Sequence, residues 1–223
     1  MLLAIETSNQ LCGACLFDRD TSGTIASKTI DIGKGHAELL MGVISDVLGQ
    51  AHTDYAKLTS IAVCAGPGSF TGIRVGVSAA IGFSVALDVP VVGVTSLQAL
   101  AFERVNTSTE ILCLIDAHRG DVYAQLFSAD GKPLDAPRQI ALDDIAMMPS
   151  LQTKLLCGSG FSMLQAAHPE LKLQVTGGSN LPAVESIARA SMNVAMCVAA
   201  KPLYLRRPDA KPQESYTLAR ALR

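Results

Sequence analysis

The sequence predicts an α/β fold of two duplicated α/β lobes with a cleft between them. Strand-like and helix-like segments alternate through the first half, a pair of strands recurs 110 positions later, and an acid ends the first strand of each pair. A chain of 223 residues, of which 49% are hydrophobic, is long enough to give each lobe a core of its own.

Short apolar segments separated by Gly, Ser and Asn predict the strands of the first half, and longer apolar segments predict its helices. The predicted strands cover residues 1–6, 11–17, 24–32, 60–65 and 91–94. The predicted helices cover residues 36–48, the segment from the loop 66–72 to about residue 87, and a segment that Ser96 caps.

The segment that begins at residue 110 repeats the start of the chain. An ungapped offset of 110 pairs Leu2 with Leu112, Ile5 with Ile115, Phe17 with Phe127 and the acid Glu6 with the acid Asp116. Residues 154–164 again give a strand, a glycine turn and a helix. We place an N-terminal lobe at residues 1–105 and a C-terminal lobe at 106–223; whether the tail returns to the first lobe stays open.

The two strand-end acids, Glu6 and Asp116, allow two interpretations. In actin-like phosphotransferases, carboxylates at these positions orient metal-bound water, while hairpin N–H groups receive the phosphate oxygens of a nucleotide. Alternatively, each carboxylate accepts hydrogen bonds from the amides of its own turn, which requires no ligand. The spacing slightly favours the second interpretation and leaves the first open.

The glycine-rich loop 66–72 matches no phosphate-binding or nucleophile motif. A Walker A loop needs a lysine after its last glycine, the dinucleotide motif needs GxGxxG rather than GxGxxxG, and Ser69 lacks the flanking glycines of a nucleophile elbow. We therefore expect a strand-to-helix turn, with Ser69 or Thr71 as the helix cap.

Composition and metal-ligand spacing exclude several classes of function. A net charge of −2 and 4% aromatic residues argue against a stand-alone nucleic-acid-binding protein. Cys12 and Cys15 form a CxxC, but on a strand they face opposite sides, and no HxxxH or HExxH pair accompanies them. The first residues carry no basic leader, and the uncharged run 75–87 would span only about 20 Å as a helix. We expect a cytoplasmic protein with reduced cysteines and no membrane segment.

The two predicted helices of the first lobe are apolar on more than one face. The run 75–87 has no charge at all, and Gly72, Gly76, Ala80 and Ser84 place small side chains at every fourth position. A second helix can approach such a row closely, and an apolar face left uncovered would mark a partner surface. The alternative, that the two helices simply bury each other, is equally consistent with the sequence.

Four segments carry a resemblance to a known family. They are LAIETS at residues 3–8, GPGSFTGIR at 66–74, IDAHRGDVY at 115–123, and PLYLR with PDA at 202–210. Together they resemble the TsaB (YeaZ) family of tRNA threonylcarbamoyladenosine biosynthesis proteins, and they extend from the first strand to the C-terminal tail.

The resemblance implies an actin-like (ASKHA) fold and a non-catalytic scaffold or activator role. The catalytic paralogue of the family, TsaD, acts with the ATPase TsaE and transfers threonylcarbamoyl to the adenosine next to the anticodon of tRNAs that read A-starting codons. By resemblance, this chain forms a heterodimer with TsaD, contacts TsaE, forms a homodimer when alone, and meets tRNA only through the complex. It would need no cofactor itself, because TsaD and TsaE supply ATP or ADP and a metal.

The resemblance and the helix pattern together assign site residues but no catalytic residue and no metal ligand. The predicted partner interface comprises Leu40, Ile44, Val47, Gly72, Arg74, Gly76, Ala80 and Phe83. The candidate vestigial nucleotide-binding residues are Glu6, Ser8, Asp116 and Gly120. Family members usually have Asp in place of Glu6 and often Arg in place of His118. The alternative function is an active small-molecule kinase or ATPase that uses Glu6 and Asp116; a peptidase is disfavoured, since no zinc pair or nucleophile is recognisable.

Overall fold

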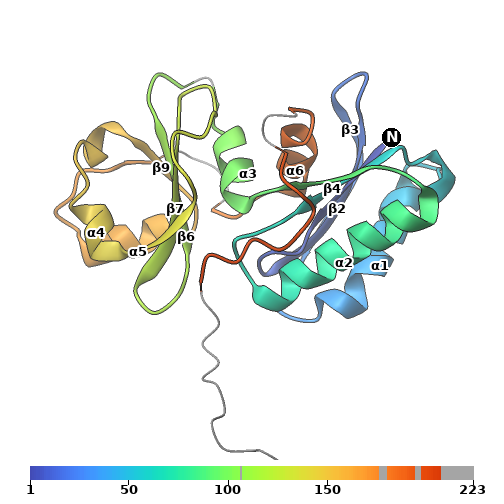
Figure 1. The fold of residues 1–223 in the computed structure, drawn as a ribbon, viewed down its shortest axis with the longest axis horizontal. Coiled ribbons are helices and arrows are strands. Elements are labelled where there is room, and N and C mark those ends of the chain that lie inside the picture. The colour runs from blue at the N-terminus through green and yellow to red at the C-terminus, as the bar shows by residue number, and fades with distance from the viewer. Residues whose placement is uncertain (106, 176–179, 194–196, 207–223) are drawn as a thin grey trace, which may run out of the picture.

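The computed structural model describes residues 1–105, 107–175, 180–193 and 197–206, and it consists of two five-stranded sheets with helices on both faces. Figure 1 shows the two sheets side by side, with α1 and α2 on the outer side of the first, α4 and α5 on the outer side of the second, and α3 and α6 between them. This arrangement confirms the predicted α/β architecture of two lobes.

The first sheet contains β1 (Leu2–Glu6), β2 (Leu11–Asp18), β3 (Gly23–Asp31), β4 (Ser60–Cys64) and β5 (Val91–Val94) in the order β3-β2-β1-β4-β5. The hairpin pairs β1–β2 and β2–β3 are antiparallel, while β4 and β5 continue the sheet in parallel to β1. Helices α1 (His36–Gln50) and α2 (Phe70–Leu87) cover one face, and every residue of β1 and β4 is buried because the other face is covered as well.

The second sheet repeats that topology. It contains β6 (Ile111–Asp116), β7 (Asp121–Phe127), β8 (Arg138–Ala141), β9 (Leu155–Cys157) and β10 (Gln174–Val175), and its order β10-β9-β6-β7-β8 is the first order read from the other edge. The outer helices are α4 (Leu142–Ala146) and α5 (Gly160–Ala167). The predicted duplication is therefore present at the level of strand order and direction.

The predicted offset of 110 is correct for the second strands of the two hairpins and wrong for the first strands. Phe17 and Phe127 both lie on inner faces, paired across the hairpin with Leu2 and Ile111. Leu2 therefore corresponds to Ile111, an offset of 109, because cross-strand partners share a face of the sheet. The equivalence of Glu6 with Asp116 fails for the same reason: one residue of register separates them, and they point to opposite faces.

The lobes exchange their last helices. Helix α3 (Ser96–Phe102) follows β5 but packs its buried side chains on the second sheet, and α6 (Val184–Ala190) follows β10 but packs on β1 and β2 of the first. The chain then continues along the first lobe, where Gly93 and Val198 exchange two backbone hydrogen bonds of 2.8 Å. The segment from α6 to Arg206 thus fastens the lobes together (Figure 1).

Side-chain caps mark where α2 and α3 begin. The Ser69 hydroxyl accepts a hydrogen bond from the Gly72 amide at 3.2 Å and caps α2, one of the two caps that the sequence allows. Thr95, rather than the predicted Ser96, caps α3, in a capping box with Gln98. The Ser96 hydroxyl instead donates to the carbonyl of Pro67 at 2.9 Å, which ties α3 to the glycine-rich loop.

Candidate functional site

The small residues of α2 seat the helix on its own sheet. A Cβ atom at Gly72 would lie 2.0 Å from the Thr7 carbonyl oxygen, and one at Gly76 would lie 2.3 Å from the Thr7 hydroxyl oxygen. The Thr7 hydroxyl donates to the Gly72 carbonyl at 2.8 Å, a bond that requires this close approach. The row of small side chains therefore fits the end of β1, not a helix of a partner.

Most of the predicted interface residues are buried, although Leu40 and Arg74 also line a groove on the solvent side of the two helices. Six of the eight are buried within the protein: Leu40, Ile44, Val47, Gly72, Gly76 and Ala80. Arg74 is exposed and Phe83 is partly buried, with its ring stacked on that of Tyr55 at 5.5 Å. Most of the predicted residues thus lie on the side of the two helices that meets the sheet, because a helix that is apolar all round does not show in its sequence which face that is.

The opposite side of the helix pair is apolar and exposed. We call the solvent side of the helix pair the α1/α2 outer face; its large exposed hydrophobic side chains are Met41, Ile81 and Val85, with exposed fractions of 49%, 43% and 79%, while Leu39, 42% exposed, lies on the other flank of α1. A shallow groove of about 330 Å³ runs between the helices at this face, lined by Ala37, Leu40, Met41, Arg74, Val75, Ser78 and Ala79. A monomeric protein rarely leaves such a surface without a partner.

Helix α2 also has the length and composition of a weak candidate membrane span. Its 18 residues have a mean hydropathy of 1.6, and the helix begins five residues before the run 75–87 considered in the sequence. One face of the helix packs on the sheet through Ile73, Val77 and Ala80. A single helix of this kind, 28% buried, does not show a membrane span.

A cleft of about 1070 Å³ lies between the lobes. Its walls come from the β1–β2 turn, the loop 67–70, the β6–β7 turn and the C-terminal segment 203–206. Among the predicted nucleotide-binding residues, Ser8 and Asp116 line it. Glu6 lies beneath Ser8 and is 1% exposed, and Gly120 lies in the β6–β7 turn with a φ of 85°.

The Glu6 carboxylate is held by its own turn. Its Oε1 accepts hydrogen bonds from the Ser8 amide at 2.5 Å, the Ser8 hydroxyl at 2.6 Å and the Asn9 side-chain amide at 3.1 Å. Its Oε2 is buried and has no hydrogen-bond partner among the described residues. Burial raises the pKa of Glu6, and the bonds from Ser8 oppose that rise.

Asp116 is held in a similar way on the other lobe. Its Oδ1 accepts a hydrogen bond from the His118 amide at 2.6 Å, and its Oδ2 lies 3.2 Å from His118 Nδ1. The Ser159 hydroxyl, at the start of α5, accepts from the Asp116 amide at 3.0 Å. Both acids therefore adopt the arrangement that needs no ligand, in which each carboxylate binds its own turn.

The C-terminal segment 203–206 closes one side of the cleft and joins the lobes. Arg74 lies 3.7 Å above the Phe70 ring and donates to the Tyr204 hydroxyl at 2.6 Å. Arg206 donates to the His118 carbonyl at 3.3 Å and pairs with Asp121 at 3.6 Å. Sequence reasoning did not assign Tyr204 or Arg206 to a site, although the PLYLR segment that contains them was noted.

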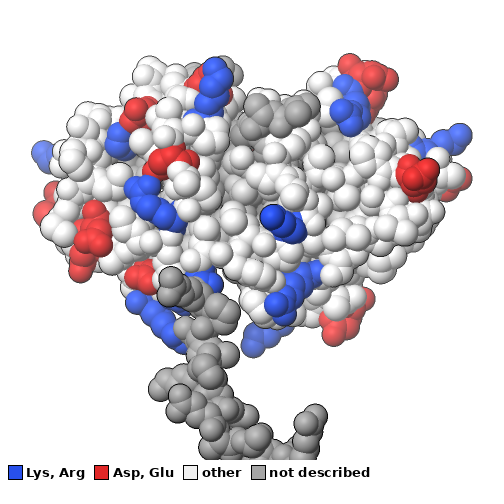
Figure 2. All heavy atoms as spheres, in the orientation of Figure 1, with Lys and Arg blue, Asp and Glu red and all other residues white. Residues whose placement is uncertain are grey.

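The remaining motifs carry no site in the described residues. Cys12 faces the α1/α2 side of the sheet and Cys15 the α6 side, as the strand geometry predicts. No group of three or more His, Cys, Asp or Glu side chains that could hold a metal occurs in the described part of the chain. A further motif of the sequence, the pair Gly177-Gly178 that resembles a nucleotide-contacting glycine pair, lies outside the described residues. On the face shown in Figure 2, basic and acidic residues are intermixed.

Comparisons with known proteins identify relatives over most of the chain. The sequence model of the family described as "TsaD: tRNA N6-adenosine threonylcarbamoyltransferase" matches residues 31–197. The chain is 30% identical over 131 residues to the tRNA threonylcarbamoyladenosine biosynthesis protein TsaB of Escherichia coli and 36% identical over 126 residues to that of Bacillus subtilis. These matches cover 58% and 56% of this chain, and they span about half of each relative, 55% and 54%.

Other relatives match along nearly the whole chain. The uncharacterized protein Rv3421c of Mycobacterium tuberculosis is 31% identical over 211 residues, which is 95% of this chain and 94% of that protein. The solved structure of YeaZ from Pseudomonas aeruginosa has a TM-score of 0.74 at 24% identity and covers 92% of this chain and 99% of its own. The shared architecture confirms the predicted actin-like (ASKHA) fold. With the family model, the curated relatives and the fold in agreement, the chain belongs to the TsaB/YeaZ family of the threonylcarbamoyladenosine system.

Proposed function

We propose that this chain is a non-catalytic scaffold and activator subunit for threonylcarbamoyl transfer to tRNA, and that it acts by pairing with TsaD through the α1/α2 outer face. The exposed apolar surface of that face is the observation that carries the proposal. Three large apolar side chains lie exposed on this face of two adjacent helices whose other sides are already covered by the first sheet.

The shape of the α1/α2 outer face also suits a helical partner. The groove between the helices is lined mainly by Ala, Ser and Val side chains, so that a ridge of larger side chains can enter it. Ile81 and Val85 extend the surface along α2 from Ser78, at the spacing of one helix face, and Met41 lines the groove on the α1 side. A stable complex would bury roughly 800 Å² on each partner, which exceeds the groove itself and requires these flanking residues.

The state of the acids supports a subunit that leaves catalysis to its partner. The carboxylates of Glu6 and Asp116 accept hydrogen bonds from their own turns. The two acids are also not equivalent positions of the duplicated hairpins, because their strands differ in register by one residue. In the proposed complex, TsaD and TsaE supply nucleotide and metal, and tRNAs that read A-starting codons are bound through the complex. We further propose a cytoplasmic protein that forms a homodimer through the same face when TsaD is absent.

The test is co-elution of purified TsaD with surface variants of this chain. Val85→Asp places a charge at the most exposed apolar residue of α2 and should weaken TsaD binding at least tenfold, because a charge that the partner covers is desolvated without an opposite charge. Met147→Asp is the matched control, since Met147 is 73% exposed on the second lobe. Undiminished co-elution of a folded Val85→Asp variant would refute the proposed interface.

The size of the inter-lobe cleft favours the alternative function, a small-molecule kinase or ATPase. Titration calorimetry of the isolated chain with MgATP separates the two proposals. A scaffold should show weak binding or none, and no turnover. Tight binding with turnover that Asp116→Ala abolishes would support the enzyme and contradict the scaffold. Reconstitution of tRNA modification with and without this chain would then measure its contribution as an activator.

A further inference from the structure

Two buried thiols of the second sheet lie in direct contact. Cys113 on β6 and Cys157 on β9 are paired in register on adjacent parallel strands, and their sulfur atoms are 3.3 Å apart. Their exposed fractions are 0% and 2%, and both are reduced. Among the described residues, no other pair of cysteine sulfur atoms lies in contact.

The geometry points to a modification site: we propose that Cys113 and Cys157 form a reversible intramolecular disulfide with a small peroxide as oxidant, and that the contact between α3 and α6 controls how fast it forms. Neighbouring strands lie about 4.8 Å apart, and disulfides span Cα separations of about 4.4–6.8 Å. Bringing the two sulfur atoms from contact to bonding distance therefore requires a local adjustment of the two strands and no change of fold.

The chemistry balances with hydrogen peroxide as the oxidant. The thiolate of one cysteine attacks a peroxide oxygen, which gives a sulfenic acid and hydroxide. The thiol of the other cysteine then attacks the sulfenic sulfur, which forms the S–S bond and releases water. Together the two thiols lose two electrons and two protons, and the peroxide is reduced to two water molecules. Contact between the sulfur atoms favours this closure over further oxidation of the sulfenic acid.

Helix α3 covers the thiol pair in the closed structure. Leu100 packs in the same core cluster as both cysteines and lies against Gly158, the residue after Cys157. Burial raises the pKa of Cys113, the hydrogen bond with Cys157 and the negative charge of Glu103 raise it further, and the positive charge of Arg104 acts in the opposite direction. The closed structure therefore keeps the pair as unreactive thiols, and reaction requires α3 to move away from the second sheet.

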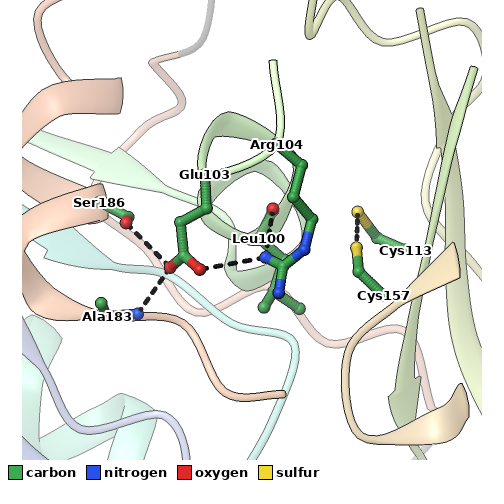
Figure 3. A network of polar contacts seen from close by, with 7 residues as sticks. All are labelled: Leu100, Glu103, Arg104, Cys113, Cys157, Ala183 and Ser186. Atoms are coloured by element: carbon green, nitrogen blue, oxygen red, sulfur yellow. Dashed lines mark hydrogen bonds and ion pairs between the residues drawn. The ribbon is translucent and has the colours of Figure 1, made fainter. Parts of the chain in front are cut away.

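Hydrogen bonds of Glu103 and Arg104, which we call the polar joint, hold α3 in that position. As Figure 3 shows, Arg104 lies between Glu103 and the two thiols; its Nη1 donates to the Leu100 carbonyl at 2.9 Å and to Glu103 at 3.0 Å. Glu103 also accepts hydrogen bonds from the Ala183 amide at 3.1 Å and the Ser186 hydroxyl at 2.9 Å, at the start of α6. Because α6 packs on the first sheet, this joint anchors α3 to the opposite lobe.

The experiment treats the purified full-length chain with hydrogen peroxide and follows intact mass, with alkylation and peptide mapping to locate each oxidised cysteine. We expect a slow loss of two hydrogen atoms that maps to Cys113 and Cys157 and is reversed by dithiothreitol. Glu103→Ala should accelerate the reaction roughly tenfold or more, since it removes charge-assisted hydrogen bonds at the joint. Cys113→Ser should abolish the reversible product.

The matched control is Glu110→Ala, which removes a glutamate that pairs with Lys154 beside the same sheet and should leave the rate unchanged. Ser186→Ala is the milder variant should Glu103→Ala fail to fold, and a smaller acceleration is expected, because it removes one of the bonds to Glu103. Peroxide oxidation of the half-buried Cys197 verifies that the oxidant is active. The proposal is overturned if Cys113 and Cys157 stay reduced while Cys197 reacts, if each is oxidised separately to the sulfinic acid, or if the rate is insensitive to the joint variants.

Discussion

The two lobes have the same strand order but cover their sheets with helices of very different length. The outer helices of the first lobe contain 15 and 18 residues, whereas those of the second contain 5 and 8. The large exposed hydrophobic side chains of the described outer helices all lie on the longer pair. Duplication has therefore preserved the sheet, which each core requires, while one lobe alone presents an extended apolar helical surface.

In both lobes a glycine in or before an outer helix lies directly against the backbone of the sheet. Replacing these glycines has the largest expected effect on stability. A Cβ atom at Gly72 would lie 2.0 Å from the Thr7 carbonyl, and one at Gly158 would lie 2.2 Å from the Leu114 carbonyl. We expect Gly72→Ala and Gly158→Ala each to lower the free energy of unfolding by about 3 kcal/mol, measured by urea denaturation, because backbone must move.

Gly82 is the matched control for Gly72, since it lies on the same helix and a Cβ atom there would have no neighbour within 4 Å. Gly82→Ala should raise the free energy of unfolding by about 0.5–1 kcal/mol through helix propensity. A Gly158→Ala variant as stable as the wild type would show that the two lobes do not share this way of seating a helix.

The buried Glu6 should give the first lobe a pH dependence of its own. Since burial raises its pKa in the folded state above the ordinary value of 4.5, the folded state retains the proton longer than the unfolded state does. The contribution of Glu6 to stability is thus largest below pH 4.5 and declines as the pH rises through the raised pKa. Glu6→Gln should remove this decline in urea denaturation measured across that range, and an unchanged pH dependence would contradict it.

The exchanged helices α3 and α6 begin in different ways, which gives the smallest prediction. Thr95, the residue before α3, caps that helix itself. At the start of α6, the Ala183 amide and the Ser186 hydroxyl instead donate to Glu103, at the end of α3. Thr95→Ala should lower the free energy of unfolding by about 1 kcal/mol, the usual cost of a lost cap. A much larger loss, seen in the same denaturation assay, would mean that the cap also holds the lobes together.

The strands and helices of the first lobe were predictable because their apolar runs are long and end at Gly, Ser and Asn. The short β8, β10 and α4 escaped prediction, since segments of two to five residues show little periodicity. The duplication was visible, but two hairpins can be matched at offsets that differ by one, and only the cross-strand pairing distinguishes them.

The sequence singles out the two apolar helices of the first lobe, but it does not show which side of each helix meets the sheet. Nothing in the sequence separates Gly76, which meets Thr7, from Gly82, which meets solvent; the difference arises from the position of the sheet. The packing of α3 and α6 on opposite sheets depends on contacts between distant parts of the chain. The same holds for Tyr204 and Arg206, which contact Arg74 and His118. No local pattern encodes such contacts.

The most direct test of the account is hydrogen–deuterium exchange of this chain with and without TsaD. We predict that TsaD slows exchange at the backbone amides of α1 and α2 and leaves α4 and α5 unchanged, because among the described outer helices the exposed large apolar side chains lie on α1 and α2. Protection confined to the second lobe or to the walls of the cleft, with α1 and α2 unaffected, would contradict the central claim.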